Sequence, residues 1–127
     1  MKSYARRGEL VATFVPKKHH EAYAGMLSGG IVASLLDCHS NWAAAHRLMK
    51  KRRLDAPPRT VTAELHVEYR RPTPIAGPIE LRTKATRCVG CRVYVQGELR
   101  AGRAGVTATS KGVFVAVKEG HPAFDAR

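Results

Sequence analysis

The sequence predicts an α+β protein in which a curved antiparallel sheet of about five to six strands wraps around one long central helix. Only one long stretch, from after Ser28 to about Arg53, repeats its apolar residues every three or four positions, which is the period of a helix. From Thr60 onward the apolar residues alternate with polar ones, as in antiparallel strands with one exposed face. One helix followed by a run of strands is typical of this layered architecture.

The elements before and within the helix follow from local patterns. A strand is expected from Glu9 to Val15, and then a loop that contains His19 and His20 and ends at residues 25–30. Ser28 is expected to cap the helix with its side chain, and the cations at 50–53 lie where the helix dipole favours positive charge. The expected buried face of the helix consists of Ile31, Leu35, Cys38, Trp42, Ala45 and Met49.

Four strands are expected after the helix. The first three, at 60–69, 79–85 and 91–99, have apolar residues at odd positions, which are expected to face the core. Val89 and Gly90 are expected to form the hairpin turn between the second and third strands. The last strand region, 104–117, is expected to be interrupted at Ser110-Lys111-Gly112.

Length and composition favour one compact domain over residues 1–127. A chain of 127 residues with 44% hydrophobic and 25% charged residues has the material for a core, which excludes a disordered tail and a coiled coil. The longest apolar run is far shorter than a membrane span, and no apolar block follows the basic start, so a cytoplasmic protein is expected. Three cysteines are expected to be reduced thiols.

The charge balance is unusual. Lysine and arginine total 22 against 10 aspartate and glutamate, which gives a net charge of +12. Such a chain attracts anions, whether nucleic acid, an acidic membrane surface or a phosphorylated small molecule. Aromatic residues are few and are not interleaved with basic runs, so the stacking platform of a single-strand binder is missing and nucleic acid is disfavoured.

Asp37 is the leading candidate for chemistry. A short carboxylate is unfavourable in mid-helix, and its neighbours one turn away, among them Ser40 and Asn41, are small or polar, so a ligand or another chain could approach. The alternative is a solvated carboxylate that bonds only to Ser40 or Asn41. At the start of the same helix, about 11 Å away along the axis, Gly29 and Gly30 offer unpaired N–H groups to an anion, or else are simply capped.

Two segments carry a family resemblance. The first is residues 21–37, with Gly29, Gly30 and the leucine pair before Asp37. The second is residues 61–72, which run from Val61-Thr62 to the tyrosine before a proline turn. Both segments resemble the PaaI-type acyl-CoA thioesterases of the hotdog fold. The resemblance covers nearly the whole chain. It implies a hotdog fold and hydrolysis of a thioester between an acyl group and coenzyme A, with no cofactor.

The resemblance also implies roles for particular residues. Asp37 is expected to be the family's acid, which acts as general base or nucleophile. Gly29, with Gly30, is expected to be the oxyanion donor, and Thr62 is expected to be the hydroxyl on the following strand. The site is expected at the interface of a homodimer, or of a homotetramer made of two dimers. Ser28 stands where the family commonly has histidine or asparagine, so a protein that binds acyl-CoA without turnover is an alternative.

Other candidate residues are supported by charge or spacing. Ser28 and Asn41 are candidate substrate contacts, and Arg70 and Arg71 are candidates to hold the phosphates of coenzyme A, because arginine suits bidentate contacts. Further basic clusters lie at 50–53 and 82–87. Metal sites at Cys88-Val89-Gly90-Cys91, at the pair His19 and His20, or at Cys38 and His39 with His46 are disfavoured, because a structural zinc needs four ligands.

Overall fold

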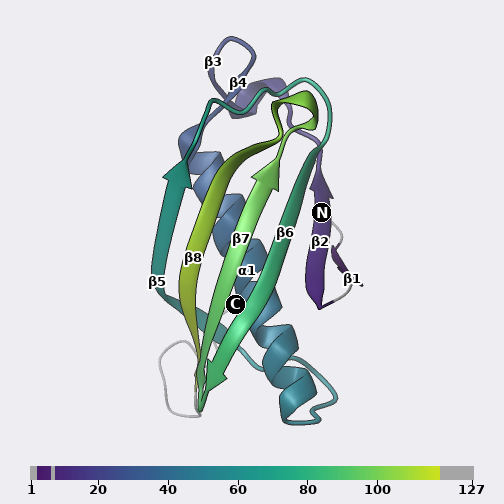
Figure 1. Ribbon diagram of the computed structural model, residues 1–127, viewed down its shortest axis with the longest axis vertical. Coiled ribbons are helices and arrows are strands. Elements are labelled where there is room, and N and C mark those ends of the chain that lie inside the picture. The colour runs from purple at the N-terminus through teal and green to yellow at the C-terminus, as the bar shows by residue number, and fades with distance from the viewer. Residues whose placement is uncertain (1–2, 7, 118–127) are drawn as a thin grey trace.

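The computed structural model describes residues 3–6 and 8–117 (Figure 1). Six antiparallel strands form the main sheet, in the spatial order β1-β2-β6-β7-β8-β5, and the sheet curves around one long helix. The predicted α+β architecture is therefore confirmed. The elements of this layer pair are β1 (Ser3–Arg6), β2 (Glu9–Phe14), α1 (Gly29–Lys51), β5 (Thr60–Tyr69), β6 (Ile79–Val89), β7 (Arg92–Arg100) and β8 (Val106–Ala116).

Short elements fill two of the connections. Between β2 and α1 the chain forms a 3₁₀ turn (η1, Lys18–His20) and a small two-stranded sheet of β3 (Glu21–Tyr23) and β4 (Met26–Leu27), where a plain loop was expected. A second 3₁₀ turn (η2, Gly102–Ala104) joins β7 to β8. In Figure 1 the β3–β4 sheet lies at the end of the molecule where α1 begins.

The prediction of the buried helix face was wrong by about one residue. Of the six residues expected to be buried, only Ala45 is; Cys38 is exposed, and Trp42 is 49% exposed. The residues of α1 that are buried are Val32, Leu36, His39, Ser40, Ala43, Ala44, Ala45 and Leu48.

The reason is that α1 carries two apolar stripes. At 100° per residue, Leu35 and Trp42 lie about 100° around the helix from Leu36 and Ala43. The outward stripe has the larger side chains, so it dominates the sequence pattern, while the inward stripe uses alanines that let the helix approach the sheet. Ile31 and Leu35 of the outward stripe are half-buried and pack against the core cluster that contains Leu36, whereas Trp42 is exposed.

Two strand features also differ from expectation. The β6–β7 turn is formed by Gly90 and Cys91, one residue later than predicted, because Gly90 supplies the positive φ of 58° that a two-residue hairpin needs. Strand β8 runs without a break through residues 110–112. Gly112 is accommodated there because the Phe114 ring occupies the space where a Cβ would lie.

The core between α1 and the sheet has two hydrophobic clusters with a polar belt between them. Leu36 and Leu81 belong to one cluster, and Leu48 and Phe114 to the other. The belt crosses three strands at one level, because Thr83 pairs with Gly97 and Gly97 pairs with Ser110. Within the described residues, three buried hydroxyl oxygens of this belt have no hydrogen-bond partner: those of Ser40, Thr83 and Ser110.

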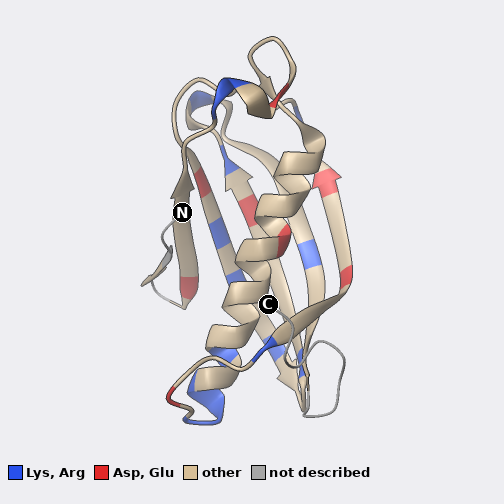
Figure 2. Ribbon diagram, turned by 180° about the vertical axis from the view of Figure 1, so that it is seen from behind, with Lys and Arg blue, Asp and Glu red and all other residues tan. Residues whose placement is uncertain are grey.

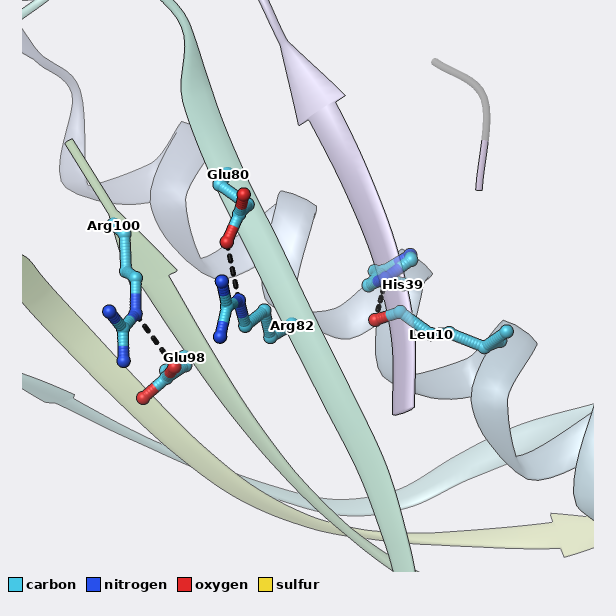
Figure 3. A network of polar contacts seen from close by, with 6 residues as sticks. All are labelled: Leu10, His39, Glu80, Arg82, Glu98 and Arg100. Carbon is cyan, nitrogen blue, oxygen red and sulfur yellow. Dashed lines mark hydrogen bonds and ion pairs between the residues drawn. The ribbon is translucent and has the colours of Figure 1, made fainter. Parts of the chain in front are cut away.

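His39 ties the helix to β2 at the level of this belt. Its Nε2 lies 3.0 Å from the carbonyl oxygen of Leu10, and the side chain is buried (Figure 3). Burial lowers the pKa of His39 below its ordinary value of 6.5, and the hydrogen bond to Leu10 opposes part of that change. The folded protein therefore favours the neutral imidazole.

Gly97 sets how closely α1 approaches the sheet. A Cβ at this position would lie 2.6 Å from Ser110 Oγ and 3.3 Å from Ser40 Oγ. We expect Gly97→Ala to lower the free energy of unfolding by about 1–3 kcal/mol through overpacking, as measured by urea denaturation. Adding Ser110→Ala should restore most of this loss, because it removes the closest atom, and a loss of the same size in the double variant would contradict the assignment.

The buried imidazole predicts a pH dependence of stability. The unfolded chain takes up a proton at His39 as pH falls through about 6.5, but the folded protein does so only at lower pH. Stability from this residue is therefore fully present above about pH 6.5 and is lost below it, at no more than about 1.4 kcal/mol per pH unit. Urea denaturation from pH 7.5 to 5 should show a shallower loss in His39→Gln than in the native chain. A parallel His46→Gln variant measures the contribution of a second histidine, because burial and the nearby Lys50 lower the pKa of His46. An unchanged slope in His39→Gln would contradict the prediction.

Candidate active site

Asp37 and Thr62 come together between α1 and the edge strand β5. Thr62 Oγ1 donates a hydrogen bond to Asp37 Oδ1 over 2.6 Å. Asp37 is half-buried and Thr62 is exposed, so the pair is open to a ligand. The carboxylate does not bond to Ser40 or Asn41, which was the alternative from sequence. A carboxylate and a hydroxyl at this distance can jointly orient a water molecule or a substrate carbonyl.

A β-bulge in β5 places Thr62 on the helix side. Thr62 pairs with Phe114 and Glu64 pairs with Val113, so Ala63 is the extra residue. The bulge reverses the alternation: Thr62 before it and Leu65 after it face α1. The sequence pattern, which assigned all odd positions of this strand to one face, was wrong for residues 61–63, because periodicity alone does not reveal one inserted residue.

Asn41 fixes the beginning of β5 against the helix. Its Nδ2 donates to Thr60 O over 3.2 Å, and Thr60 Oγ1 donates back to the backbone oxygen of Asn41 over 3.3 Å and to its side-chain oxygen. These contacts lie one helical turn from Asp37 and two residues from Thr62. Asn41, a candidate substrate contact in the sequence, is thus engaged within the protein and positions the strand that carries Thr62.

The first turn of α1 presents free backbone donors. Gly29 and Gly30 are exposed, and among the described residues no acceptor is found for their N–H groups. Ser28 occupies the N-cap with an extended backbone, φ −61° and ψ 136°, but its side chain makes no capping hydrogen bond, which contradicts the expected serine cap. The unpaired donors and the positive end of the helix dipole together suit an oxyanion.

Tyr69 at the end of β5 holds the helix start. Its hydroxyl donates to Gly29 O over 2.6 Å, and its ring lies beside Gly29, where a Cβ would be 3.6 Å from ring atom Cε1. Sequence reasoning noted this tyrosine only as part of the family pattern. The sequence did hold one signal for its role: Pro72 ends the strand soon after Tyr69, so Tyr69 lies at the strand end, near the start of the helix.

The two candidate catalytic groups lie far apart within one chain. Eight residues separate Gly29 from Asp37 in a continuous helix, which is about 12 Å along the axis. A reacting carbonyl needs its oxyanion donor and its attacking atom each within about 3–3.5 Å. An aspartate side chain spans too little of the remaining distance for both groups of one protomer to act on the same carbonyl.

The two arginines predicted to hold phosphates make different contacts. Arg70 lies on the outer face, away from Asp37, with its Nε 3.8 Å from Glu68 Oε1. Arg71 Nη1 donates to Ala104 O over 3.0 Å, which leaves the rest of its guanidinium exposed at the end of the molecule where α1 begins. Both arginines follow Tyr69 and so lie at the helix-start end, but only Arg70 is engaged in an ion pair on the outer face.

Charges on the outer face alternate rather than accumulate. Figure 3 shows the ion pairs of Arg82 with Glu80 and of Arg100 with Glu98, and across the strands Arg82 is opposite Glu98 and Arg100 is opposite Glu80. Two shallow hollows of about 510 and 420 Å³ lie on this face, and neither includes Asp37 or Gly29. Such alternation does not form the continuous basic track that a nucleic acid backbone would need.

The described residues contain neither a metal-binding cluster nor a membrane-spanning helix. In residues 3–6 and 8–117, no group of three or more histidine, cysteine, aspartate and glutamate side chains is arranged to hold a metal ion. The rings of His19 and His20 contact each other in a tilted arrangement, with centroids 4.0 Å apart and an interplanar angle of 51°. Over the same part of the chain, no helix combines the length and the apolar character needed to cross a membrane.

Comparison with known proteins identifies the family. No protein-family model and no curated protein matches the sequence. The fold, however, is similar to that of a thioesterase superfamily protein from Shewanella loihica, with 32% identity over 92% of this chain and 90% of that protein and a TM-score of 0.77. It is also similar to PaaI of the E. coli phenylacetic acid degradation operon, with 13% identity over 92% of this chain and 79% of that protein and a TM-score of 0.77.

A thioesterase from Haemophilus influenzae has the same fold, with 15% identity over 94% of this chain and 80% of its own and a TM-score of 0.77. At these lower identities the last two proteins support the fold alone, whereas the Shewanella protein is similar in sequence along nearly the whole chain. The resemblance expected from residues 21–37 and 61–72 is confirmed. This chain belongs to the thioesterase superfamily of the hotdog fold.

Proposed function

We propose that the protein hydrolyses the thioester bond of an acyl-CoA, with Asp37 and Thr62 from one protomer and the N–H of Gly29 from another. The observation that carries the proposal is the 2.6 Å hydrogen bond between Thr62 and Asp37 beside an accessible surface. The free donors at the start of α1 support it, because hydrolysis of a thioester develops negative charge on the carbonyl oxygen.

The reaction follows from these groups. The thioester carbonyl oxygen accepts a hydrogen bond from Gly29 N–H, with Gly30 N–H as a neighbouring donor. Asp37 removes a proton from a water molecule whose oxygen attacks the carbonyl carbon, or attacks that carbon itself to form an anhydride that water then opens. The carbon–sulfur bond breaks and the thiolate of coenzyme A leaves. Since a thiol has a pKa near 8.5, the leaving group needs no strong general acid.

Thr62 orients the attacking group. Its hydroxyl hydrogen is directed at Asp37, so its oxygen is available to accept a hydrogen bond from the attacking water. This places the water within reach of the carboxylate. Asn41 and Tyr69 are positioning residues. They fix β5 and the start of α1, and they do not face the reacting atoms.

A homodimer supplies both halves of each site. The roughly 12 Å between Gly29 and Asp37 is too long for one protomer, whereas a twofold axis that sets two helices antiparallel brings the start of one beside Asp37 of the other. The ten-residue edge strand β5, which pairs only with β8 among the described strands, and the outward apolar stripe of α1 are surfaces that such a partner would cover. A tetramer of two such dimers would bury more of the stripe.

Coenzyme A offers phosphates to the basic end of the site. Arg71 is the residue we propose for this contact, because it is exposed at the helix-start end. Arg70 faces the other side of the sheet and pairs with Glu68, so we propose no role for it in binding within its own protomer.

The first test removes the carboxylate charge. Asp37→Asn should lower thioesterase turnover by at least about 100-fold, the usual scale for loss of a positioned base, in a thiol-release assay over a panel of acyl-CoAs. Far-UV circular dichroism and sedimentation should show an unchanged fold and assembly. Turnover near that of the native chain would reject Asp37 as the acid; saturable binding without turnover in the native chain would favour the acyl-CoA-binding alternative.

The second test asks whether the site is shared between protomers. Gly29→Pro removes the proposed donor, and it suits the first helical position because Ser28 is already extended. Each variant alone should be inactive, but mixed dimers of Asp37→Asn and Gly29→Pro chains regain one complete site. After unfolding and refolding together, the mixture should recover about a quarter of native turnover, since about half the dimers are mixed. No recovery in a mixture shown to contain mixed dimers would contradict the shared site.

A further inference from the structure

The β6–β7 hairpin brings two thiols to the end of α1. Cys88 lies on the helix-facing side of β6, opposite Val93, and Cys91 is the second residue of the Gly90-Cys91 turn. Both are half-buried and pack against the core cluster that contains Leu48. Figure 1 shows this hairpin at the end of the molecule where α1 ends, opposite the end with the β3–β4 sheet.

Each thiol accepts a hydrogen bond from a different cation. Lys51 Nζ lies 3.6 Å from Cys88 Sγ, and Arg52 Nη2 lies 3.5 Å from Cys91 Sγ. The two cations are consecutive residues, so one helix end covers both sulfurs. Figure 2 shows lysine and arginine gathered at this end. Each sulfur thus faces a charged donor, and the thiolate is the form of cysteine that reacts with peroxides and disulfides.

Both partners of this contact are held by backbone hydrogen bonds. Arg53 adopts a left-handed conformation, φ 54°, and the N–H groups of Arg53 and Leu54 donate to Lys50 O and Met49 O, which fixes the helix end. On the hairpin, Ala116 N donates to Cys91 O over 2.9 Å. The cations are therefore kept over the sulfurs by the fold and not by a flexible loop.

The surroundings favour redox chemistry over metal binding. A pair of thiolates would need further ligands to hold zinc, and within the described residues no third cysteine, histidine or carboxylate joins them. The neighbours are instead two cations, which repel a metal ion and attract the anionic form of sulfur. Cys38, the remaining cysteine, lies on the outward stripe of α1.

We propose that Cys88 and Cys91 form a redox-active dithiol that hydrogen peroxide converts to an intramolecular disulfide. One thiolate attacks an oxygen of peroxide, the O–O bond breaks, and a sulfenic acid and water result once hydroxide takes up a proton. The second thiolate then attacks the sulfenic sulfur, the S–S bond forms, and hydroxide leaves and becomes a second water. Two thiols and one peroxide thus give one disulfide and two waters, with sulfur oxidised and peroxide oxygen reduced.

The test uses the full chain with Cys38→Ser, so that Cys88 and Cys91 are the only thiols. After brief treatment with hydrogen peroxide, both thiols should resist alkylation together, the intact mass should fall by two hydrogens, and a thiol reductant should reverse the change. Non-reducing electrophoresis should show no covalent dimer. In Cys91→Ser, Cys88 should instead be trapped as a sulfenic acid by dimedone.

The cations provide the matched comparison. Lys51→Met with Arg52→Met should slow the loss of thiols about tenfold, whereas Lys50→Met, at a residue for which the structure records no contact with either sulfur, should leave the rate unchanged. Circular dichroism confirms that each variant is folded. The proposal is overturned if peroxide only adds oxygen without loss of hydrogen, if the cation variants react at the native rate, or if the reduced protein retains zinc that protects both thiols.

Discussion

The close approach of α1 to the sheet is the constraint on which the rest of the structure depends. Gly97 and the alanines on the inward side of the helix allow it, because any larger side chain would push Ser40 away from Ser110. At this distance the sheet can curve around the helix and bury both hydrophobic clusters. The three hydroxyls left without partners in the polar belt are the unfavourable side of this packing.

The same approach positions the candidate site and the thiol pair. Because α1 lies against β5, Asp37 meets Thr62 and Tyr69 meets Gly29. Because its last turn lies against the β6–β7 hairpin, Lys51 meets Cys88. One long, straight element therefore links an oxyanion-type donor site at its start with a cationic end over two sulfurs, and a shift of the helix along its axis would alter both.

The positive charges of this chain, whose net charge is +12, are not spread evenly over its surface. On the outer face, Arg82 and Arg100 each have a carboxylate neighbour along their own strand and across the β6–β7 pair (Figure 3). Other lysines and arginines gather at both ends of the molecule, one of which is where α1 ends beside the hairpin (Figure 2). Composition reports the total charge, whereas function depends on where that charge is placed.

The sequence by itself determined the class of fold, the extent of the helix to within two residues, and the presence of β2 and β5 to β8, because hydrophobic periodicity is a local property; it did not indicate β1 or the β3–β4 sheet. It also singled out Asp37 and Gly29 as candidates, since a carboxylate in mid-helix and a glycine pair at a helix start stand out against their surroundings, whereas Thr62 entered only through the family resemblance. The resemblance carried by residues 21–37 and 61–72 then indicated the superfamily, which the Shewanella protein confirms.

Only the tertiary structure decided which stripe of α1 is buried, because both stripes have helical period and the larger side chains of the outward one dominate the pattern. It alone revealed the bulge at Ala63, which turns Thr62 toward the helix, since one extra residue leaves no local signal. The tertiary structure likewise gave the neighbouring arginines different partners, Glu68 for Arg70 and the backbone oxygen of Ala104 for Arg71. Each of these features depends on contacts between residues distant in sequence, which no local pattern encodes.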